Sequence, residues 1–253
     1  RVTAALLTAP GNSARQEANS LISRKPEVLR IFESPEAGKK EGKSVAGKSE
    51  RSFSYGMRRR DAEKERLIRE NAFKMFFEEG FSGFSMQKLA KASGVSPATL
   101  YIYFKDKDDL IMQLYAEEMQ KMTSATLEGF EASMPFAEGL RIQWMNRARY
   151  FLANPYQAHF LEQVRYTPFH DRAMGVIDPH FLKQMKGFVH NAIRNGELVD
   201  VPVEIYWSVA FSPLYQLIKF DLHGVSFPGI PRFKLNEKSM LKALELVLKA
   251  LKP

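Results

Sequence analysis

One predicted helix opens with four side chains suited to contact with DNA bases, in the run Ser96-Pro97-Ala98-Thr99. A helix that enters the major groove must present short or donor-bearing side chains near its N-terminus, so that its backbone can approach the base edges. All four residues meet this requirement. Ser96 is also a good N-cap, and Pro97 suits the first helical position. These properties fit a helix that reads double-stranded DNA.

Side chains for enzymatic chemistry form no known pattern. The sequence has no cysteine, which excludes disulfides, thiolate zinc sites, iron–sulfur clusters and cysteine nucleophiles. It also lacks a Gly-x-Ser-x-Gly elbow, a phosphate-binding glycine loop and His-Glu-x-x-His. His159 and Glu162, three residues apart on one predicted helix face, could begin a metal site, with a hydrogen-bonded or exposed histidine as the alternative. We therefore predict no enzymatic activity, no catalytic residue, no cofactor and no metal.

The composition favours a soluble, cytoplasmic protein with a mild preference for polyanions. The 253 residues include 37 Lys plus Arg and 29 Asp plus Glu, a formal net charge of +8. This length is one large domain or two ordinary ones. No apolar run reaches the roughly 20 residues that span a bilayer, since polar residues and Pro213 interrupt the best stretch, 205–220.

Short helical patterns surround the run at residues 96–99. Apolar spacing predicts a helix over 68–76, with Gly80 placed for a left-handed cap. Ser85 can cap a second helix of two turns that ends near Gly94, which makes the turn to the third. A longer helix followed by two short ones across a glycine-containing turn is a helix-turn-helix with its supporting first helix.

The rest of the chain also has a helical pattern. Asp106 can cap a helix toward Thr126, with Asp109 in a capping-box-like position. Proline, glycine and Asn or Asp separate further predicted helices at 136–153, 155–166, 179–195, 202–223 and 236–252. No convincing alternating strand is present, so the predicted fold class is all-α.

Four linked segments carry a family signature: Phe76-Phe-Glu-Glu-Gly80-Phe, Ser85-Met-Gln-Lys-Leu-Ala90, Gly94-Val-Ser-Pro-Ala-Thr-Leu-Tyr101-Ile-Tyr-Phe104 and Lys105-Asp-Lys-Asp-Asp-Leu110. Together they resemble the TetR family of bacterial transcriptional regulators. The resemblance implies a three-helix DNA-binding head on a helical ligand-binding and dimerisation body. It also implies a repressor that a small molecule releases from a palindromic operator. A similar DNA binder without a small ligand, architectural or protein-regulated, is the alternative.

The resemblance assigns DNA contacts position by position. The implied base contacts are Pro97, Ala98, Thr99 and Ile102, with Gln87 reaching in from the second helix. Glutamine can bind adenine, whereas the alanine, isoleucine and threonine methyl groups can touch thymine. Phosphate contacts, which position the head without reading sequence, fall to four residues: Ser85, Tyr101, Tyr103 and Lys107.

Some residues of the head depart from the family pattern or have a second interpretation. Tyr103 stands where a histidine is frequent, although a phenol can still donate to a phosphate. The recognition helix has no arginine, the side chain that most often binds guanine in bidentate fashion, so we expect no strong preference for guanine. Tyr101 and Tyr103 could instead be solvated helix tyrosines. The run Arg58–Arg60 could be a solvated helix start or a basic arm beside the minor groove.

The first 56 residues differ from the remainder. They contain Pro10, Pro26, Pro35 and five glycines, and they lack a sustained apolar period. We predict a disordered arm, either natural or foreign to the native chain. The predicted domains are therefore this arm over 1–56, the helix-turn-helix domain over 57–105 and the body over 106–253.

The body is rich in aromatic side chains, most of which we expect in its core. By resemblance it should hold a largely apolar cavity for an unidentified effector, and the predicted lining is Trp144, Phe151, Phe160, Gln163 and Phe188. Five arginines leave room for an anionic ligand, although solvated arginines are the alternative: Arg141, Arg147, Arg149, Arg165 and Arg172. By resemblance the last two long helices pair with their copies in a homodimer, and a purely internal core is the alternative. The predicted interface residues are Val209, Leu214, Leu217, Leu244 and Leu248.

Overall fold

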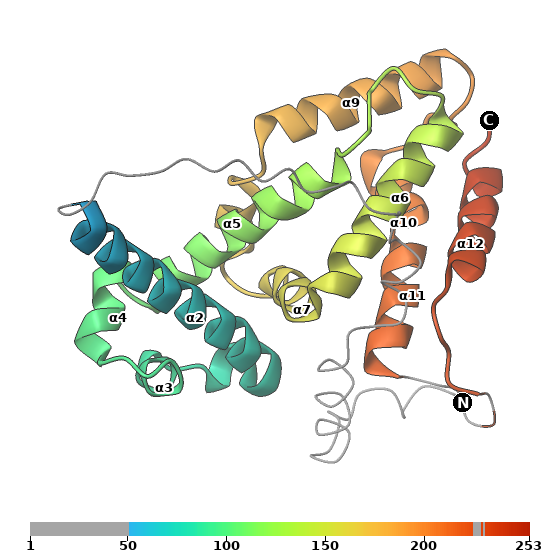
Figure 1. Cartoon of the computed structure of the whole chain (residues 1–253). Helices are drawn as coiled ribbons and strands as arrows, with labels where there is room; N and C mark the ends of the chain where they lie inside the picture. The colour runs from blue at the N-terminus through green and yellow to red at the C-terminus, as the bar shows by residue number, and fades with distance from the viewer. Residues whose placement is uncertain (1–50, 225–228, 230) are drawn as a thin grey trace, which may run out of the picture. The chain divides into compact units, whose positions relative to one another are not determined.

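A computed structural model describes residues 51–224, 229 and 231–253, and every regular element among them is a helix (Figure 1). The predicted all-α class is confirmed. The helices are α2 (Arg51–Gly83), α3 (Met86–Ala92), α4 (Pro97–Tyr103), α5 (Lys107–Thr126), α6 (Phe136–Ala153), α7 (Pro155–Val164), α8 (His170–Met174), α9 (Pro179–Arg194), α10 (Val203–Ala210), α11 (Ser212–His223) and α12 (Glu237–Ala250).

The predicted N-terminal arm lies largely outside the described residues. Its last six residues, 51–56, belong to α2, so the helix begins earlier than the predicted start at Met57. A single interior glycine costs a helix only about 1 kcal/mol, so Gly56 is compatible with a continuous helix. The backbone of Arg58–Arg60 is helical as well.

The chain divides into two compact units. The described part of the first, here called the head unit, comprises 51–118 and 156–175. The second, the body unit, comprises 119–155 and the described residues from 176 to 253. The head unit is therefore larger than the predicted domain 57–105, because it takes in the first half of α5 and most of α7.

Phenylalanine rings from α2 and α7 form much of the head core. Phe160 is fully buried, lies edge-on to Phe73 at 5.2 Å between ring centroids, and packs on Phe76 at 5.1 Å. The Phe76 ring also stacks on Phe84 at 4.3 Å. Leu89 and Leu100, predicted as core from their spacing, are fully buried. This core fixes the two short helices against the longer one.

Electrostatic contacts reinforce the head unit. Arg69 of α2 pairs with Glu117 of α5 at 2.7 Å and with Glu65 at 2.7 Å, and its guanidinium lies 5.4 Å from the centroid of the Phe104 ring. Asn71 Nδ2 donates to the carbonyl oxygen of Ala92 at 3.3 Å. These bonds connect α2 to α5 and to the end of α3.

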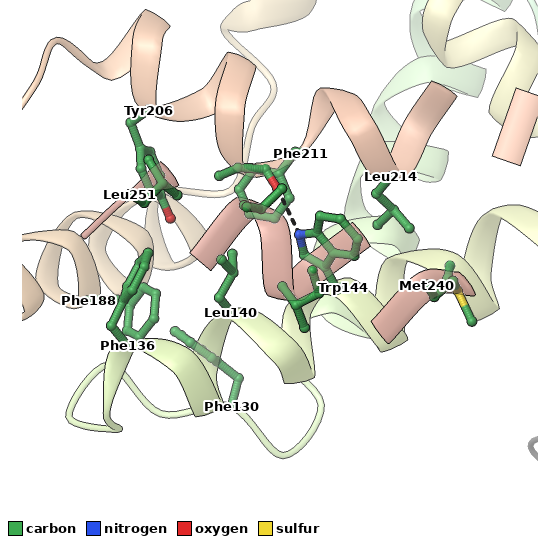
Figure 2. Packing of buried hydrophobic residues seen from close by; sticks show 14 of the residues in the cluster. Phe130, Phe136, Leu140, Trp144, Phe188, Tyr206, Phe211, Leu214, Met240 and Leu251 are labelled. Atoms are coloured by element: carbon green, nitrogen blue, oxygen red, sulfur yellow. Dashed lines mark hydrogen bonds between the residues drawn. The ribbon is translucent and has the colours of Figure 1, made fainter. Parts of the chain in front are cut away.

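The body unit is a bundle in which α6 packs against α9, α11 and α12, and α10 packs against α11 and α12. Its apolar core includes Phe130, Phe136, Leu140, Trp144 and Phe188 (Figure 2). The Trp144 indole donates to the carbonyl oxygen of Ala210 at 2.7 Å, so its only polar group is satisfied inside the core.

Among the helices after α5, one prediction was wrong and one helix was not predicted. The single helix expected over 202–223 is two helices, broken at Phe211, whose φ of −123° and ψ of −27° are not helical. Proline at position 213 has no N–H to donate, and its ring clashes with the carbonyl four residues earlier, which explains the break. The short helix α8 was not predicted at all, because its five residues are too few for a periodic signal.

Candidate nucleic-acid interface

The recognition helix α4 is held by local capping and by a glycine turn. The Ser96 hydroxyl accepts from the N–H of Thr99 at 3.1 Å, and Pro97 occupies the first turn. Gly94, between α3 and α4, has φ 65°, a value that other residues adopt only with strain. The cap, the proline and the turn predicted from the sequence are confirmed.

Gly80 and Asp106 define the ends of the supporting helices. Gly80 has φ 68° and ψ −178°, so the predicted positive φ is present, but the residue is extended rather than left-handed helical, and one short turn follows it. Asp106 Oδ1 accepts from the N–H of Asp109 at 2.8 Å, and Asp109 Oδ2 accepts from the N–H of Lys105 at 2.9 Å. Both aspartates thus cap the start of α5, as predicted, although Asp109 accepts from Lys105 rather than from Asp106 as in a full capping box.

The predicted base contacts lie on α3 and α4 and are accessible. Ile102 is 78% exposed, an unusual position for a large apolar side chain on a short helix. Pro97, Ala98 and Gln87 are exposed, and Thr99 is half-buried with its hydroxyl 2.9 Å from that of Ser96. Apart from Tyr101, the exposed side chains of α4 are apolar, and their methyl and methylene groups can touch thymine but cannot bind guanine in bidentate fashion.

Three of the four predicted phosphate contacts are exposed or half-buried residues of α4 and of the start of α3. Tyr101 is 51% exposed, and Tyr103 is half-buried at the last position of α4. Ser85 is half-buried and serves as the N-cap of α3, where its hydroxyl oxygen accepts from the N–H of Lys88 at 3.4 Å. A capping serine retains its O–H donor for a phosphate oxygen.

The fourth predicted phosphate contact, Lys107, has a different role in the structure. Its ammonium donates to the carbonyl oxygen of Phe81 at 2.7 Å and to that of Phe84 at 3.4 Å, and it lies 5.5 Å from the centroid of the Phe84 ring. Because the chain leaves the helix at Gly80, these carbonyl groups lack helical partners, and the lysine supplies one. Lys107 therefore acts first as a cap for the segment after α2.

Sequence reasoning missed two exposed lysines beside the same helices. Lys105 follows α4 by two residues, and Lys91 lies in the last turn of α3; both side chains are exposed. Lys105 belongs to the same Lys-Asp-Lys run as Lys107, so the sequence contained a signal for it as well.

A lysine exchange separates these two roles. Replacing Lys107 with methionine is expected to lower the free energy of unfolding by about 1–2 kcal/mol, because two carbonyl groups lose a charged donor. Replacing Lys105 with methionine should leave stability unchanged, weaken binding to all DNA sequences alike and reduce the salt dependence by about one charge. Urea unfolding and fluorescence anisotropy at several salt concentrations measure both effects. If the Lys107 variant instead weakened DNA binding and the Lys105 variant lowered stability, Lys107 would be the phosphate contact.

Comparison with known proteins agrees with this geometry. Residues 68–114 match the family model described as bacterial regulatory proteins, tetR family. The chain is 31% identical, over 157 residues, to an HTH-type transcriptional regulator of Haemophilus influenzae, and the match covers 59% of this chain and 81% of that protein. The chain belongs to the TetR family. It is accordingly a transcriptional regulator with a DNA-binding helix-turn-helix, and it is not an enzyme.

Solved structures of TetR-family regulators have the same fold. A regulator from Marinobacter aquaeolei has a TM-score of 0.59 and 26% identity, covering 77% of this chain and 98% of that one. A Haemophilus influenzae regulator has a TM-score of 0.61 and 23% identity, covering 76% of this chain and 98% of that one. The resemblance thus extends beyond the head to about three quarters of this chain.

The five residues predicted to line an effector cavity are divided between the head unit and the body unit of this TetR-family protein. Trp144 and Phe188 are each 1% exposed and pack inside the body core. Phe160 is in the core of the head unit, and Gln163, half-buried, lies on the same helix, α7. Phe151 is half-buried and lies edge-on to Tyr215 at 5.5 Å. Helical periodicity identified buried aromatic residues correctly but could not tell which unit each one enters.

A hollow in the body unit is open and polar rather than closed and apolar. Its volume is about 440 Å³, and its wall includes Glu128, Arg141, Arg149 and Glu237. It contains none of the five predicted residues. An open hollow with mixed charges differs from the largely apolar pocket that was expected.

The predicted dimer residues lie in or against the core of the single chain. Leu214 and Leu244 are 0% and 3% exposed and belong to the internal core, which was the alternative interpretation. Val209, Leu217 and Leu248 are half-buried against that core. Other apolar side chains on α10 and α12 face solvent in the single chain: Val203 at 66%, Ile205 at 51% and Leu246 at 57% exposed.

His159 lies edge-on to the Phe77 ring at 5.0 Å, within the head unit. In the described part of the chain, no three histidine, aspartate or glutamate side chains form a group suited to a metal ion. Within the same residues, no helix combines the length and hydropathy needed to span a membrane.

Proposed function

We propose that this protein is a repressor that binds a two-fold-related operator as a homodimer and leaves it when a small molecule binds the body unit. The accessible, mainly apolar surface of α4 on a firmly packed helix-turn-helix is the observation that carries the DNA-binding part. A two-fold protein matches a palindromic site whose half-sites are about one helical turn, or a multiple, apart. The proposed compartment is the cytoplasm, where operator DNA is located in bacteria.

Within the head we propose that Pro97, Ala98, Thr99 and Ile102 contact base edges and that Gln87 reaches in from α3. Because α4 lacks arginine and presents methyl groups, thymine and adenine should dominate the readout. The proposed phosphate contacts are Ser85, Tyr101, Tyr103 and, in place of Lys107, the exposed Lys105.

For the homodimer we propose contacts through α10, α11 and α12. The exposed Val203, Ile205 and Leu246 lie on the first and last of these helices. Isolated apolar side chains are normal on a surface, but three on helices of one bundle favour burial against a second copy. The half-buried Val209, Leu217 and Leu248 would complete that surface.

The proposed switch uses α5, which contributes residues to both compact units. An effector must bind more tightly to the form whose recognition helices are misplaced, because equal affinity for both forms shifts nothing. A tilt of α5 would change the separation of two heads in a dimer. The alternative, a regulator controlled by a protein or by none, needs no such effector.

Operator selection tests the proposal. Purified protein incubated with a library of genomic fragments should enrich fragments that share a two-fold element, with two chains bound per element. Anisotropy titrations should then give an affinity about 10³-fold or more above that for random DNA at physiological salt. If no fragment outcompetes random DNA, the operator-binding proposal is wrong.

A further inference from the structure

A buried cation in the body unit lacks a full set of partners. Arg147 of α6 is 1% exposed, and it alone is buried among the five arginines considered for an anionic ligand. Its Nη1 donates to the Tyr215 hydroxyl at 2.9 Å and lies 3.6 Å from the Met122 sulfur. Among the described residues, its Nε and Nη2 have no hydrogen-bond partner. These two nitrogens share one edge of the guanidinium, an edge that can bind a carboxylate with two parallel hydrogen bonds.

A second unsatisfied group lies one helical turn away. Gln143 is 0% exposed, and neither its Oε1 nor its Nε2 has a hydrogen-bond partner in the part of the chain that the structure describes. Residues four apart lie on the same helix face, so the amide and the guanidinium are neighbours on α6. Buried polar atoms without protein partners are rare in folded proteins, so two such side chains on one helix face form a site where a polar ligand can bind.

The surroundings of Arg147 are aromatic. The guanidinium carbon lies 4.5 Å from the Phe211 ring centroid, 5.2 Å from that of Trp207 and 5.9 Å from that of Phe181. Ring faces attract a cation but leave its N–H donors unsatisfied. In the described residues no carboxylate forms an ion pair with Arg147. The site therefore offers apolar walls and a positive charge without a counter-charge.

Tyr206, Tyr215 and Trp207 surround the Arg147 guanidinium together with the phenylalanine rings. Burial raises the pKa of Tyr206, and the nearby charge of Arg147 opposes that rise only in part, so the phenol stays neutral. Trp207 and Tyr215 contact the Arg147 guanidinium and are themselves half-buried, so each side chain lies between the guanidinium and solvent. Rotation of either ring would open a path to the guanidinium.

We infer that this group, built on Arg147 and Gln143, binds an effector that carries one carboxylate on an apolar body. The carboxylate would accept from Nε and Nη2 of Arg147 and from Nε2 of Gln143, and the apolar part would lie against Phe181 and Trp207. This inference rests on the proposed effector-controlled function and names the chemical class of the effector.

The probes are acetate, phenylacetate and octanoate, with phenylacetamide as the neutral match for phenylacetate. Calorimetry and thermal melts of the full chain should show binding of phenylacetate or octanoate. A rise in melting temperature of about 3–6 °C is expected when the probe is roughly ten-fold above its Kd. Phenylacetamide should not bind, because it lacks the charge that the guanidinium needs.

Two variants show where the probe binds. Arg147→Met, close in volume and without polar atoms, should reduce carboxylate affinity by about 30- to 100-fold. It should not lower the melting temperature of the free protein, since it removes an unpaired buried charge. Gln143→Leu should also weaken carboxylate binding while keeping the fold. Arg141→Met, an exposed arginine on the same helix, is the matched control and should bind the probes normally.

Three results would overturn the inference: no binding of any carboxylate at millimolar concentration, equal binding of phenylacetamide, or a lower melting temperature for Arg147→Met without loss of probe affinity. Operator binding is measured on the same preparations without probe. If no carboxylate binds but operator binding is intact, only this class of effector is rejected. Failure of operator binding itself rejects the proposed function, whatever the probes do.

Discussion

Aspartate in place of Ile102 is expected to weaken operator binding by about 100- to 1,000-fold while leaving the fold intact. The wild-type side chain is 78% exposed on α4, so the substitution removes no core packing. On the DNA it replaces a proposed methyl contact with a negative charge among phosphates, and like charges at an interface cost several kcal/mol. Anisotropy titration with the selected operator measures the loss.

The matched control is Leu182→Asp. Leu182 is 50% exposed on α9 in the body unit, so it receives the same change of chemistry on a comparably exposed helix. Its operator affinity and melting temperature should stay near those of the wild type. Equal losses in both variants would assign the effect to net charge, and an unaffected Ile102→Asp would remove α4 from the proposed interface.

The helix-turn-helix was predictable because its signals are local. Ser96 as a cap, Pro97 in the first turn and Gly94 in the intervening turn each act within three or four residues, and each is present in the structure. Leu89 and Leu100 were identified as core by helical spacing for the same reason. A short motif with fixed turn chemistry leaves few alternative conformations.

Tertiary partners were not predictable in the same way. Periodicity shows that Phe160 and Trp144 face inward, but it cannot show that one joins the head core and the other the body core. Lys107 has a lysine's usual preference for solvent, and only the exit of the chain at Gly80 brings carbonyl oxygens to its ammonium. Arg147 is a similar case, since arginine in a sequence favours a solvated interpretation until its burial is known.

Phe160, which was predicted to line a cavity and lies in the head core, gives the largest expected change in stability. Replacing Phe160 with alanine should lower the free energy of unfolding by about 3–5 kcal/mol, the usual cost of removing a fully buried ring. The ring packs on Phe73 and Phe76 and stacks on Phe81 at 5.7 Å, so its loss leaves a cavity between α2 and α7. Urea unfolding gives the loss as a lower midpoint at constant slope.

Tyr166→Ala is the control for this prediction, because Tyr166 is an aromatic residue of the same unit that is 79% exposed. Its removal should change the free energy of unfolding by no more than about 0.5 kcal/mol. The Phe160 variant also separates a core role from the cavity-lining role first predicted for it. A core residue lowers stability and leaves carboxylate affinity per folded molecule unchanged. A Phe160→Ala protein of nearly normal stability that had lost probe binding would instead place Phe160 at the effector site, and would require a binding site other than the one built on Arg147.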